Sequence, residues 1–306
     1  MIAFIFPGQG SQKVGMGRAA HDALEVARAT FREADEALGE PLSRLCFDGP
    51  EDELELTRNT QPAILTVSIA LFRALDAPCE VVAGHSLGEY SAHVAAGTLP
   101  FDEAVRIVRA RGSYMQEAVP VGEGAMAAVM GAERDRVERV CRETEGVVEP
   151  ANYNSPGQIV IAGATAAVEA AGAALKEQGA RVVPLPVSAP FHSSLMRPAE
   201  ERLRPHLREA RFAGPKVPVY ANVDAAPVAT AEAAADALER QVSRPVRWED
   251  SVRRMVDEGV TTFVEIGPGR VLSGLIGRIA RGTKRVSVQG PDDLEAAREA
   301  IAAARR

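Results

Sequence analysis

The sequence predicts an α/β fold in which a small domain interrupts a larger one. Short apolar runs alternate with stretches of helical periodicity along the 306 residues, which favours strands and helices in alternation. Between residues 122 and 188 the order becomes β-α-β-β-α-β, the ferredoxin-like order. We therefore assign residues 1–121 and 189–306 to a large α/β domain and residues 122–188 to an inserted ferredoxin-like domain. In the inserted domain we expect strands at 124–130, 147–152, 158–162 and 182–187, and helices at 134–144 and 166–178.

The elements of the large domain follow from the spacing of its apolar residues. From Leu24 to Leu38 these residues recur at three- and four-residue steps, which predicts an amphipathic helix. Residues 62–75 are apolar on nearly every side, which predicts a buried central helix, and the alanine-rich stretch 229–237 predicts a surface helix. The expected strands are Ile2–Phe6, Glu80–Ala83, Val217–Ala221, Thr261–Ile266 and Arg285–Val288.

Composition argues against several classes of protein. A formal net charge of −7 argues against general nucleic-acid binding, and no apolar run approaches the ~20 residues that a membrane helix needs. The apolar start, Met1–Phe6, has no basic leader and predicts a strand instead of a signal peptide. The three cysteines are scattered and form no CxxC pair, so we expect neither a disulfide framework nor a zinc site, and we expect a cytoplasmic protein.

A G-x-S-x-G motif, Gly84–Gly88, lies between a predicted strand and a helical stretch from Leu87 to Ala96. A sharp strand-to-helix turn exposes the serine oxygen, and the flanking glycines relieve crowding at the bend. The first amides of the helix point toward the serine, where they can stabilise an oxyanion. The motif predicts Ser86 as a nucleophile, and a tight turn with an incidental serine is the alternative.

Five histidines could supply the base that a nucleophilic serine needs. His21 and His206 lie in charged helical stretches, where solvated surface histidines are expected. His85 should point away from the adjacent serine, and His93 should be packed in its helix beside the carboxylate one turn earlier. His192 lies in a loop after a predicted strand, just before a helix, and is the preferred base by elimination.

A glycine-rich loop, Gly8–Gln12, follows the first predicted strand. The loop lacks the spacing and the lysine of a phosphate-binding loop, and it does not fit G-x-G-x-x-G. We expect instead that the backbone amide of Gln9 faces Ser86 from the neighbouring strand end. Together with the amide of Leu87, it would complete an oxyanion hole.

Arg111 is the most informative charged residue. It lies on the apolar face of the predicted helix 101–117, together with Met115. A guanidinium in an apolar stripe is costly unless it is paired. Its partner could be a protein carboxylate in a buried ion pair, or a substrate carboxylate held by two parallel hydrogen bonds.

Taken together, these motifs resemble the malonyl-CoA:acyl carrier protein transacylases, including the discrete acyltransferases of polyketide assembly lines. The likeness runs over nearly the whole chain, and the order and joint presence of the segments are specific where each segment alone is not. The matching segments are Phe6–Gln12, Gln61–Ala63, Gly84–Tyr90, Arg111-Gly112, Met115-Gln116, Asn152–Gln158, Phe191–Ser193, Pro245–Trp248 and Glu265–Gly269.

The resemblance implies an α/β-hydrolase-like large domain, with the active site in the cleft between it and the ferredoxin-like domain. It implies Ser86, His192 and Arg111 as nucleophile, base and malonate anchor, and the Gln9 and Leu87 amides as the oxyanion hole. Substrate-binding roles are implied for Phe191, Met115 and Asn154. The bulky Phe191 resembles the residue that crowds the malonyl α-carbon in malonyl-selective acyltransferases.

The reaction implied is transfer of malonyl from malonyl-CoA to the phosphopantetheine thiol of an acyl carrier protein through a serine ester, in fatty-acid or polyketide biosynthesis. Two half-reactions through one ester predict ping-pong kinetics, and no metal or redox cofactor is needed. The resemblance also implies a monomer in which a backbone carbonyl near Arg247 orients the histidine. Many relatives carry glutamine at that position, so an inward-pointing Arg247 would add a second cation to the site.

Two other classes share part of this pattern. A serine thioesterase or acyl hydrolase acting on carrier-bound acyl groups would use the same serine motif. It needs no carboxylate anchor, however, and usually has its catalytic residues in the order Ser, Asp/Glu, His. A non-catalytic carrier-binding module would need none of Ser86, His192 and Arg111 together. We therefore expect malonyl transfer.

Overall fold

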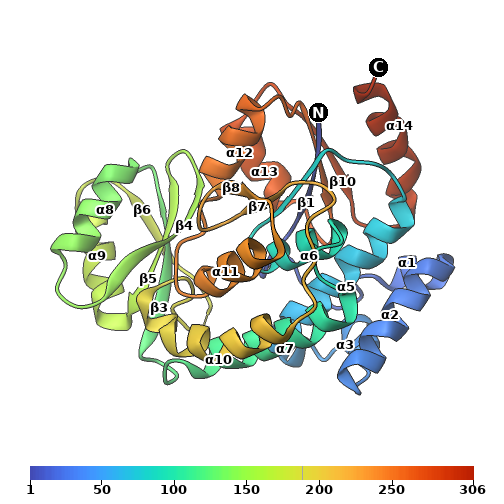
Figure 1. The fold of residues 1–306 in the computed structure, drawn as a ribbon. Helices are drawn as coiled ribbons and strands as arrows, with labels where there is room; N and C mark the ends of the chain where they lie inside the picture. Colours follow the sequence, from blue (N-terminus) through green and yellow to red (C-terminus); the bar gives the residue numbers. More distant parts are fainter. Residues whose placement is uncertain (188) are drawn as a thin grey trace.

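The computed structural model describes residues 1–187 and 189–306, and its strands form two separate sheets (Figure 1). The larger sheet contains β1 (Ile2–Phe6), β2 (Val81–Gly84), β7 (Val219–Ala221), β8 (Ala226–Val228), β9 (Thr262–Ile266) and β10 (Lys284–Val288). The strand order is β10-β9-β1-β2-β7-β8, and all neighbours are parallel except β7 and β8. The α/β prediction is therefore confirmed, and β8 is a strand that the sequence did not predict.

Helices cover both faces of the larger sheet because its strands are apolar on both sides. Along β1, Ile2, Phe4 and Phe6 join the main core on one face. Ala3 and Ile5 join a second core on the other face. The second core includes α12 (Trp248–Asp257) and α13 (Val271–Ile279), and the main core includes α2 (Glu25–Leu38), α5 (Thr57–Leu75), α6 (Leu87–Ala95), α7 (Phe101–Glu117) and α14 (Leu294–Ala304).

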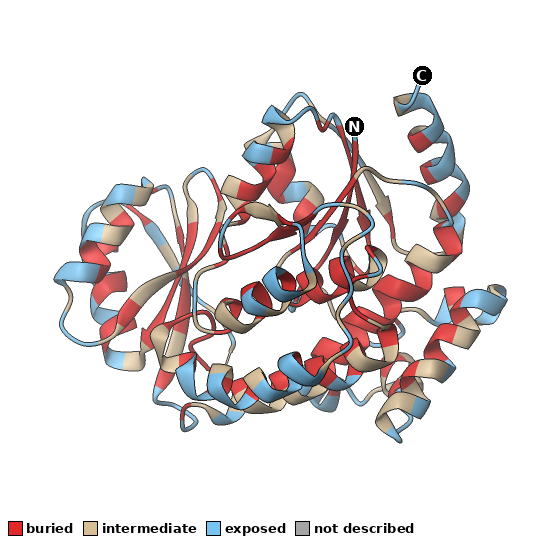
Figure 2. Ribbon diagram, in the orientation of Figure 1, coloured by how far each residue is buried: buried red, intermediate tan, exposed pale blue. Residues whose placement is uncertain are grey.

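The distribution of burial follows the predicted patterns. Figure 2 shows the inner strands of the larger sheet, β1, β2, β7 and β9, and helix α5 as almost continuously buried. The stretch 62–75 is thus the buried helix that its composition predicts. The expected surface helix at 229–237 is α11 (Ala231–Gln241), which buries one face. The remaining helices are α1 (Arg18–Ala23), α3 (Leu42–Asp48), α4 (Glu51–Glu55) and α10 (Arg197–Glu209), with 3-10 turns at Ser194–Met196 and Pro291–Asp293.

The smaller sheet is antiparallel, and its elements come in the predicted β-α-β-β-α-β order. It contains β3 (Gly124–Met130), β4 (Val148–Ser155), β5 (Gln158–Ala164) and β6 (Arg181–Pro184) in the order β4-β5-β3-β6, with α8 (Arg134–Glu143) and α9 (Thr165–Glu177). That strand order is the ferredoxin-like arrangement. The domain division at residues 121/122 and 188/189 stays a prediction, and Ser188 lies outside the described residues.

The two faces of the smaller sheet have different partners. One face packs on α8 and α9, and Val137 of α8, Leu175 of α9 and Ile161 of β5 belong to one apolar core. Met126 of β3 and Val160 of β5 belong instead to the core of the larger part. Strand β4 is also joined directly to the segment before α12, because the Tyr153 amide donates to the carbonyl of Val246 at 2.9 Å. The smaller sheet is thereby fixed beside the carboxyl ends of β1 and β2.

Candidate active site

The serine motif forms a tight turn between β2 and α6. Ser86 has φ 51° and ψ −108°, a left-handed backbone conformation that is costly for a residue with a side chain. A Cβ atom at Gly84 would lie 1.9 Å from the main-chain carbon of Gly88, and one at Gly88 would lie 2.0 Å from the carbonyl oxygen of Phe6. Only glycine fits at either position. The two glycines therefore allow the tight turn Gly84–Gly88, called the elbow below, which exposes the Ser86 hydroxyl.

Ser86 and His192 meet although 106 residues separate them in the chain. The Oγ of Ser86 lies 2.7 Å from Nε2 of His192, and Nδ1 of His192 lies 2.9 Å from the carbonyl oxygen of Gln241. A carbonyl oxygen can only accept, so Nδ1 carries the proton. In the neutral ring Nε2 is then an acceptor, and it is oriented to take the proton of the Ser86 hydroxyl.

Burial keeps the imidazole of His192 neutral. The residue is 4% exposed. Burial, with the positive charge of Arg111 as the second cause, lowers the pKa of His192 to about 3. At neutral pH the ring is therefore neutral, and its unprotonated Nε2 is a base beside a serine hydroxyl, as nucleophilic catalysis requires.

Arg111 of α7 is 1% exposed and points its guanidinium at the same hydroxyl. Nη1 donates to Oε1 of Gln61 and Nη2 to Oε1 of Gln241, both at 2.8 Å, and Nη2 also lies 3.2 Å from Oγ of Ser86. Within the described residues no carboxylate comes within ion-pair distance of Arg111. The alternative of a buried ion pair with a protein carboxylate is therefore wrong.

A cavity of about 360 Å³ opens onto Ser86, His192 and Arg111. Met126 and Asn152 bring the smaller sheet to its wall, so the cavity lies between the two sheets. Of the residues expected to contact substrate, Met115 and Phe191 line it. The other lining residues are Gln9, Gly10, Gln12, Glu55, Gln61, His85, Leu87, Leu185, Pro186 and Val187.

The predicted oxyanion donors lie at this cavity. The Gly8–Gln12 loop packs directly on the elbow, since a Cβ atom at Gly8 would lie 2.4 Å from the carbonyl oxygen of His85. The amide of Ser86 is already used, because it donates to Oδ1 of Asn222 at 2.7 Å. Leu87 is the first residue of α6, where amides lack an intrahelical acceptor. Among the described residues the Gln9 amide has no acceptor either, so both amides can donate to a ligand.

Asn154 is placed differently from the expectation. Its Oδ1 lies 2.8 Å from Nε2 of His85, and it does not line the cavity, whereas Asn152 does. Residues two apart share one face of a regular strand, but β4 is irregular between Tyr153 and Ser155. Asn152 therefore lines the cavity, whereas the Asn154 side chain contacts His85 next to Ser86. The His85 ring thus contacts Asn154 and lies near Trp248, with no hydrogen bond to Ser86 among the described residues.

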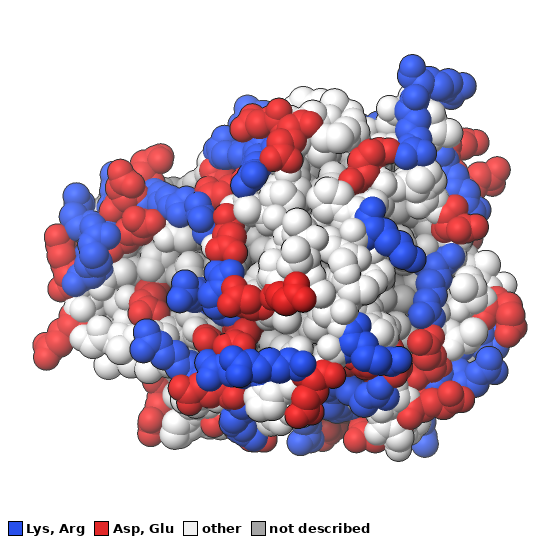
Figure 3. Space-filling model, in the orientation of Figure 1, with Lys and Arg blue, Asp and Glu red and all other residues white. Residues whose placement is uncertain are grey.

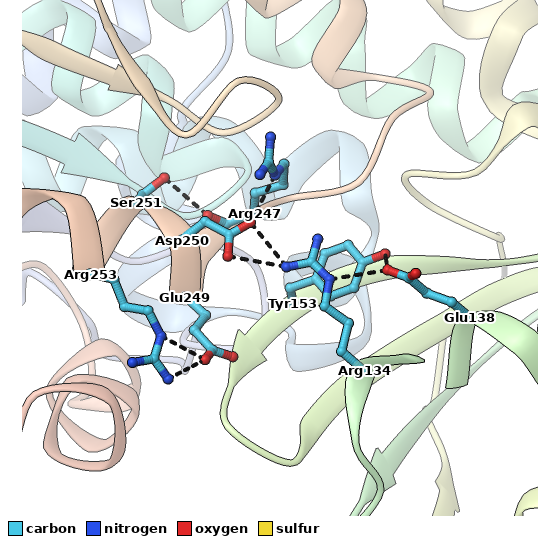
Figure 4. Close-up of polar contacts among 8 residues, drawn as sticks. All are labelled: Arg134, Glu138, Tyr153, Arg247, Glu249, Asp250, Ser251 and Arg253. Atoms are coloured by element: carbon cyan, nitrogen blue, oxygen red, sulfur yellow. Dashed lines mark hydrogen bonds and ion pairs between the residues drawn. The ribbon is translucent and has the colours of Figure 1, made fainter. Parts of the chain in front are cut away.

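The carbonyl that orients His192 also differs from the expectation. It belongs to Gln241, six residues before Arg247 in the sequence. Nε of Arg247 instead donates to Asp250 at 2.8 Å, and Asp250 also accepts from Arg134 of α8 at 3.1 Å (Figure 4). Arg247 therefore adds no second cation to the cavity; its charge lies in an ion cluster between α12 and the smaller sheet.

Sequence reasoning missed two polar residues of the site. The Gln241 side chain accepts from Arg111 and donates from Nε2 to the Ser86 carbonyl at 3.0 Å and to Glu89 at 2.7 Å. Asn222 holds the elbow from the other side, since its Nδ2 donates to the carbonyl of Gly84 at 2.7 Å. A signal for Gln241 did exist: it continues the apolar stripe of α11, as Arg111 continues that of α7.

Comparison with known proteins agrees with this geometry. The chain matches the family described as "Acyl transferase domain" over residues 3–290. A malonyl CoA-acyl carrier protein transacylase of Bacillus subtilis (strain 168) is 48% identical, over 97% of this chain and 96% of the relative. The structure of an acyl carrier protein S-malonyltransferase from Vibrio cholerae superposes with a TM-score of 0.95, at 46% identity over 97% of this chain and 99% of that one.

A further solved structure includes a carrier. It is a malonyl-transacylase in complex with its type II PKS acyl-carrier protein, and it has a TM-score of 0.95 at 45% identity, over 98% of this chain and 99% of that one. The relatives match at least 97% of the chain, and the two solved structures share its fold. The chain therefore belongs to the malonyl-CoA:acyl carrier protein transacylase family.

Proposed function

We propose that Ser86 carries malonyl as an ester between malonyl-CoA and the phosphopantetheine thiol of an acyl carrier protein, with His192 as base and Arg111 as anchor for the malonyl carboxylate. One observation carries this assignment: a buried guanidinium, which no carboxylate of the described residues pairs with, lies 3.2 Å from the hydroxyl of a serine that is hydrogen-bonded to a neutral histidine. Such a site accepts an acyl group that bears a carboxylate.

The first half-reaction follows from these contacts. Oγ of Ser86 attacks the thioester carbonyl while its proton moves to Nε2 of His192. The amides of Gln9 and Leu87 hold the oxyanion that forms on the carbonyl oxygen. The C–S bond then breaks, and the proton on Nε2 passes to the departing CoA sulfur, which leaves malonyl on Ser86.

The second half-reaction uses the same groups in reverse. Nε2 of His192 takes the proton of the phosphopantetheine thiol, and the sulfur attacks the ester carbonyl of malonyl-Ser86. When the C–O bond breaks, the proton returns from Nε2 to Oγ. Throughout, the Gln241 carbonyl accepts from Nδ1 and stabilises the ring while it is positively charged.

A thioesterase is the competing function, and two observations disfavour it. Nδ1 of His192 is hydrogen-bonded to a carbonyl oxygen and, in the part of the chain that the structure describes, to no acid. Hydrolysis of carrier-bound acyl groups also needs no anchor like Arg111. Incubation with malonyl-CoA alone should release about one CoA per enzyme and then stop. Adding holo carrier protein should restart CoA release and add a malonyl mass to the carrier. Continuous CoA release with free malonate, in the absence of carrier, would establish hydrolysis instead.

The pH dependence tests the base. His192 acts in its neutral form, and its pKa is lowered from an ordinary 6.5 to about 3. Activity of the free enzyme should therefore persist as the pH falls through 6.5 and be lost only at lower pH. A bound carboxylate offsets the charge of Arg111, so the inflection in kcat should lie above that in kcat/KM. The measurement is CoA release against pH, and an acid inflection of kcat/KM at or above 6.5 would contradict the assignment.

The carrier protein needs a local basic surface, because acyl carrier proteins are acidic and this chain is acidic as a whole. Figure 3 shows both signs of charge interspersed over one face of the molecule. We propose a basic surface near α13 as part of the docking site. Its residues are exposed and, among the described residues, have no carboxylate partner: Arg270, Arg278, Arg281, Lys284 and Arg285.

Charge reversal tests that surface. Arg270 follows Gly269, which lies beside Ser11 of the loop at the cavity, and Arg278 donates to Gln158 of the smaller sheet. Arg270→Glu and Arg278→Glu should each raise the KM for carrier severalfold, more at low salt, because rim charges steer association. CoA release from malonyl-CoA alone should not change. Arg32→Glu, at an exposed residue of α2, is the matched control, and equal losses in both half-reactions would contradict the docking role.

We further propose a cytoplasmic monomer. In support, all three cysteines are free thiols, and burial raises the pKa of Cys79 and of Cys141 to about 12, which suits structural thiols in a reducing compartment. Large exposed apolar residues within the described ranges are isolated along the chain, from Met1 to Val271. No helix of the described residues is long and apolar enough to cross a membrane.

A further inference from the structure

Glu89, in the first turn of α6, is a buried carboxylate behind the site. It is 0% exposed. Its Oε2 accepts from the backbone amide of Asn222 at 2.9 Å and from Nε2 of Gln241 at 2.7 Å. Within residues 1–187 and 189–306, its Oε1 has no hydrogen-bond partner, and the nearest cation-forming group is Nε2 of His93 at 3.8 Å. Within the described residues no arginine or lysine pairs directly with this carboxylate.

Arg111 and Glu89 are therefore two buried charges that no oppositely charged Asp, Glu, Lys or Arg of the described residues contacts directly, and Gln241 lies between them. The Gln241 amide accepts from Nη2 of Arg111 through Oε1 and donates to Glu89 through Nε2. The orientation of this amide is fixed, because its oxygen can only face the donor and its nitrogen can only face the acceptor. Cation and anion are thus linked across a single amide group.

Separation by an amide has a chemical consequence. A buried cation is costly without a compensating charge. A protein carboxylate in direct contact with Arg111, however, would occupy the N–H groups of the guanidinium that bind the substrate carboxylate. Burial lowers the pKa of Arg111, and the nearby Tyr90 and Glu89 oppose that shift. A carboxylate one amide away compensates the charge and leaves the guanidinium free.

We propose that Glu89 is the counter-charge of Arg111 and sets how tightly the site holds a malonyl carboxylate. The proposal rests on the proposed role of Arg111 as the anchor. Glu89 touches neither substrate nor Ser86 Oγ and acts through Gln241 and through its field, so it is a positioning and specificity residue. Its charge should weaken the binding of a carboxylate-bearing acyl group and leave a neutral acyl group unaffected.

Glu89→Gln separates the charge of Glu89 from its hydrogen bonds. Asn222 and Gln241 both donate to the same oxygen, Oε2, so a single amide oxygen can accept both bonds. The new NH₂ group would take the place of Oε1 and face Nε2 of His93, which has no partner among the described residues. The substitution therefore keeps volume and hydrogen bonds and removes one negative charge.

The experiment measures binding without turnover, in the Ser86→Ala background. The Kd of malonyl-CoA and of acetyl-CoA is determined by calorimetry, with and without Glu89→Gln. Malonyl-CoA should bind about tenfold more tightly in the Glu89→Gln variant, the order expected for one charge removed at ~10 Å through an effective dielectric constant of about 20. The Kd of acetyl-CoA should not change. Glu177→Gln, at an exposed residue of α9, makes the same change of net charge and should alter neither value.

The outcomes separate this proposal from the one on which it rests. If Ser86→Ala binds malonyl-CoA and acetyl-CoA equally, Arg111 is not an anchor and both proposals fail. If malonyl-CoA is preferred but Glu89→Gln leaves the ratio of the two Kd values unchanged, only the role of Glu89 fails. Glu89→Asp keeps the charge and disturbs the packing, so the ratio of the two Kd values should stay near that of Ser86→Ala alone. This variant tests the proposal even if Glu89→Gln does not fold. An equal shift of the ratio in both variants would assign the effect to packing.

Discussion

Ser86→Ala is expected to take up no malonyl group from malonyl-CoA and to lose transfer to the carrier by about 10⁴-fold or more. The reason is geometric. The Oγ of Ser86 lies 2.7 Å from the only lone pair that His192 offers, since Nδ1 is committed to the Gln241 carbonyl. Intact-protein mass after incubation with malonyl-CoA reads the adduct, and peptide mapping locates it.

Ser91→Ala is the matched control for this substitution. Ser91 lies in α6, the helix that Ser86 precedes, and is fully buried, and its Oγ has no hydrogen-bond partner among the described residues. It lies beyond the elbow, so the Ser91→Ala enzyme should form the malonyl adduct like the parent. An adduct of normal yield on Ser86→Ala would remove Ser86 from the mechanism.

The sequence was most informative where the chemistry is local. The elbow needs only a strand, two glycines around Ser86 and a helix, and all of these lie within a short stretch of chain. The ferredoxin-like order was equally readable because each of its strands and helices has its own periodicity. Arg111 stood out because a charge interrupts an apolar stripe, and the long range contact to the serine follows from burying that stripe.

What the sequence could not show is which distant groups satisfy the buried polar atoms. The orienting carbonyl was expected near Arg247, but it belongs to Gln241, the last residue of α11, where carbonyls have no donor within the helix. Which distant donor such a carbonyl meets depends on tertiary packing that no periodicity encodes. Strand β8 was missed for a related reason: it has three residues, one of them Pro227, and pairs only as the edge of the sheet.

Arg111→Ala is expected to remove most malonyl transfer, by about 2–5 kcal/mol or roughly 30- to 5,000-fold, because a substrate carboxylate then enters a buried site without its charged partner. Acetyl-CoA has no carboxylate to leave unpaired, so relative activity toward it should rise. The variant also leaves Glu89 without its counter-charge, so some stability should be lost. Competition between the two thioesters, read as carrier-protein mass, reports the ratio independently of the fraction that is folded.

Arg111→Lys makes the same test more specific, because it keeps the positive charge and removes the planar guanidinium with its parallel N–H donors. Lysine cannot donate to Gln61, Gln241 and a carboxylate with the geometry of a guanidinium. If two parallel hydrogen bonds hold the malonyl group, Arg111→Lys should lose much of the malonyl preference that Arg111→Ala loses. If charge alone suffices, Arg111→Lys should retain nearly all of it. An Arg111→Ala enzyme that still transfers malonyl at the parent rate and prefers it over acetyl would show that the guanidinium compensates Glu89 only, and the carboxylate must then be bound elsewhere on the cavity wall.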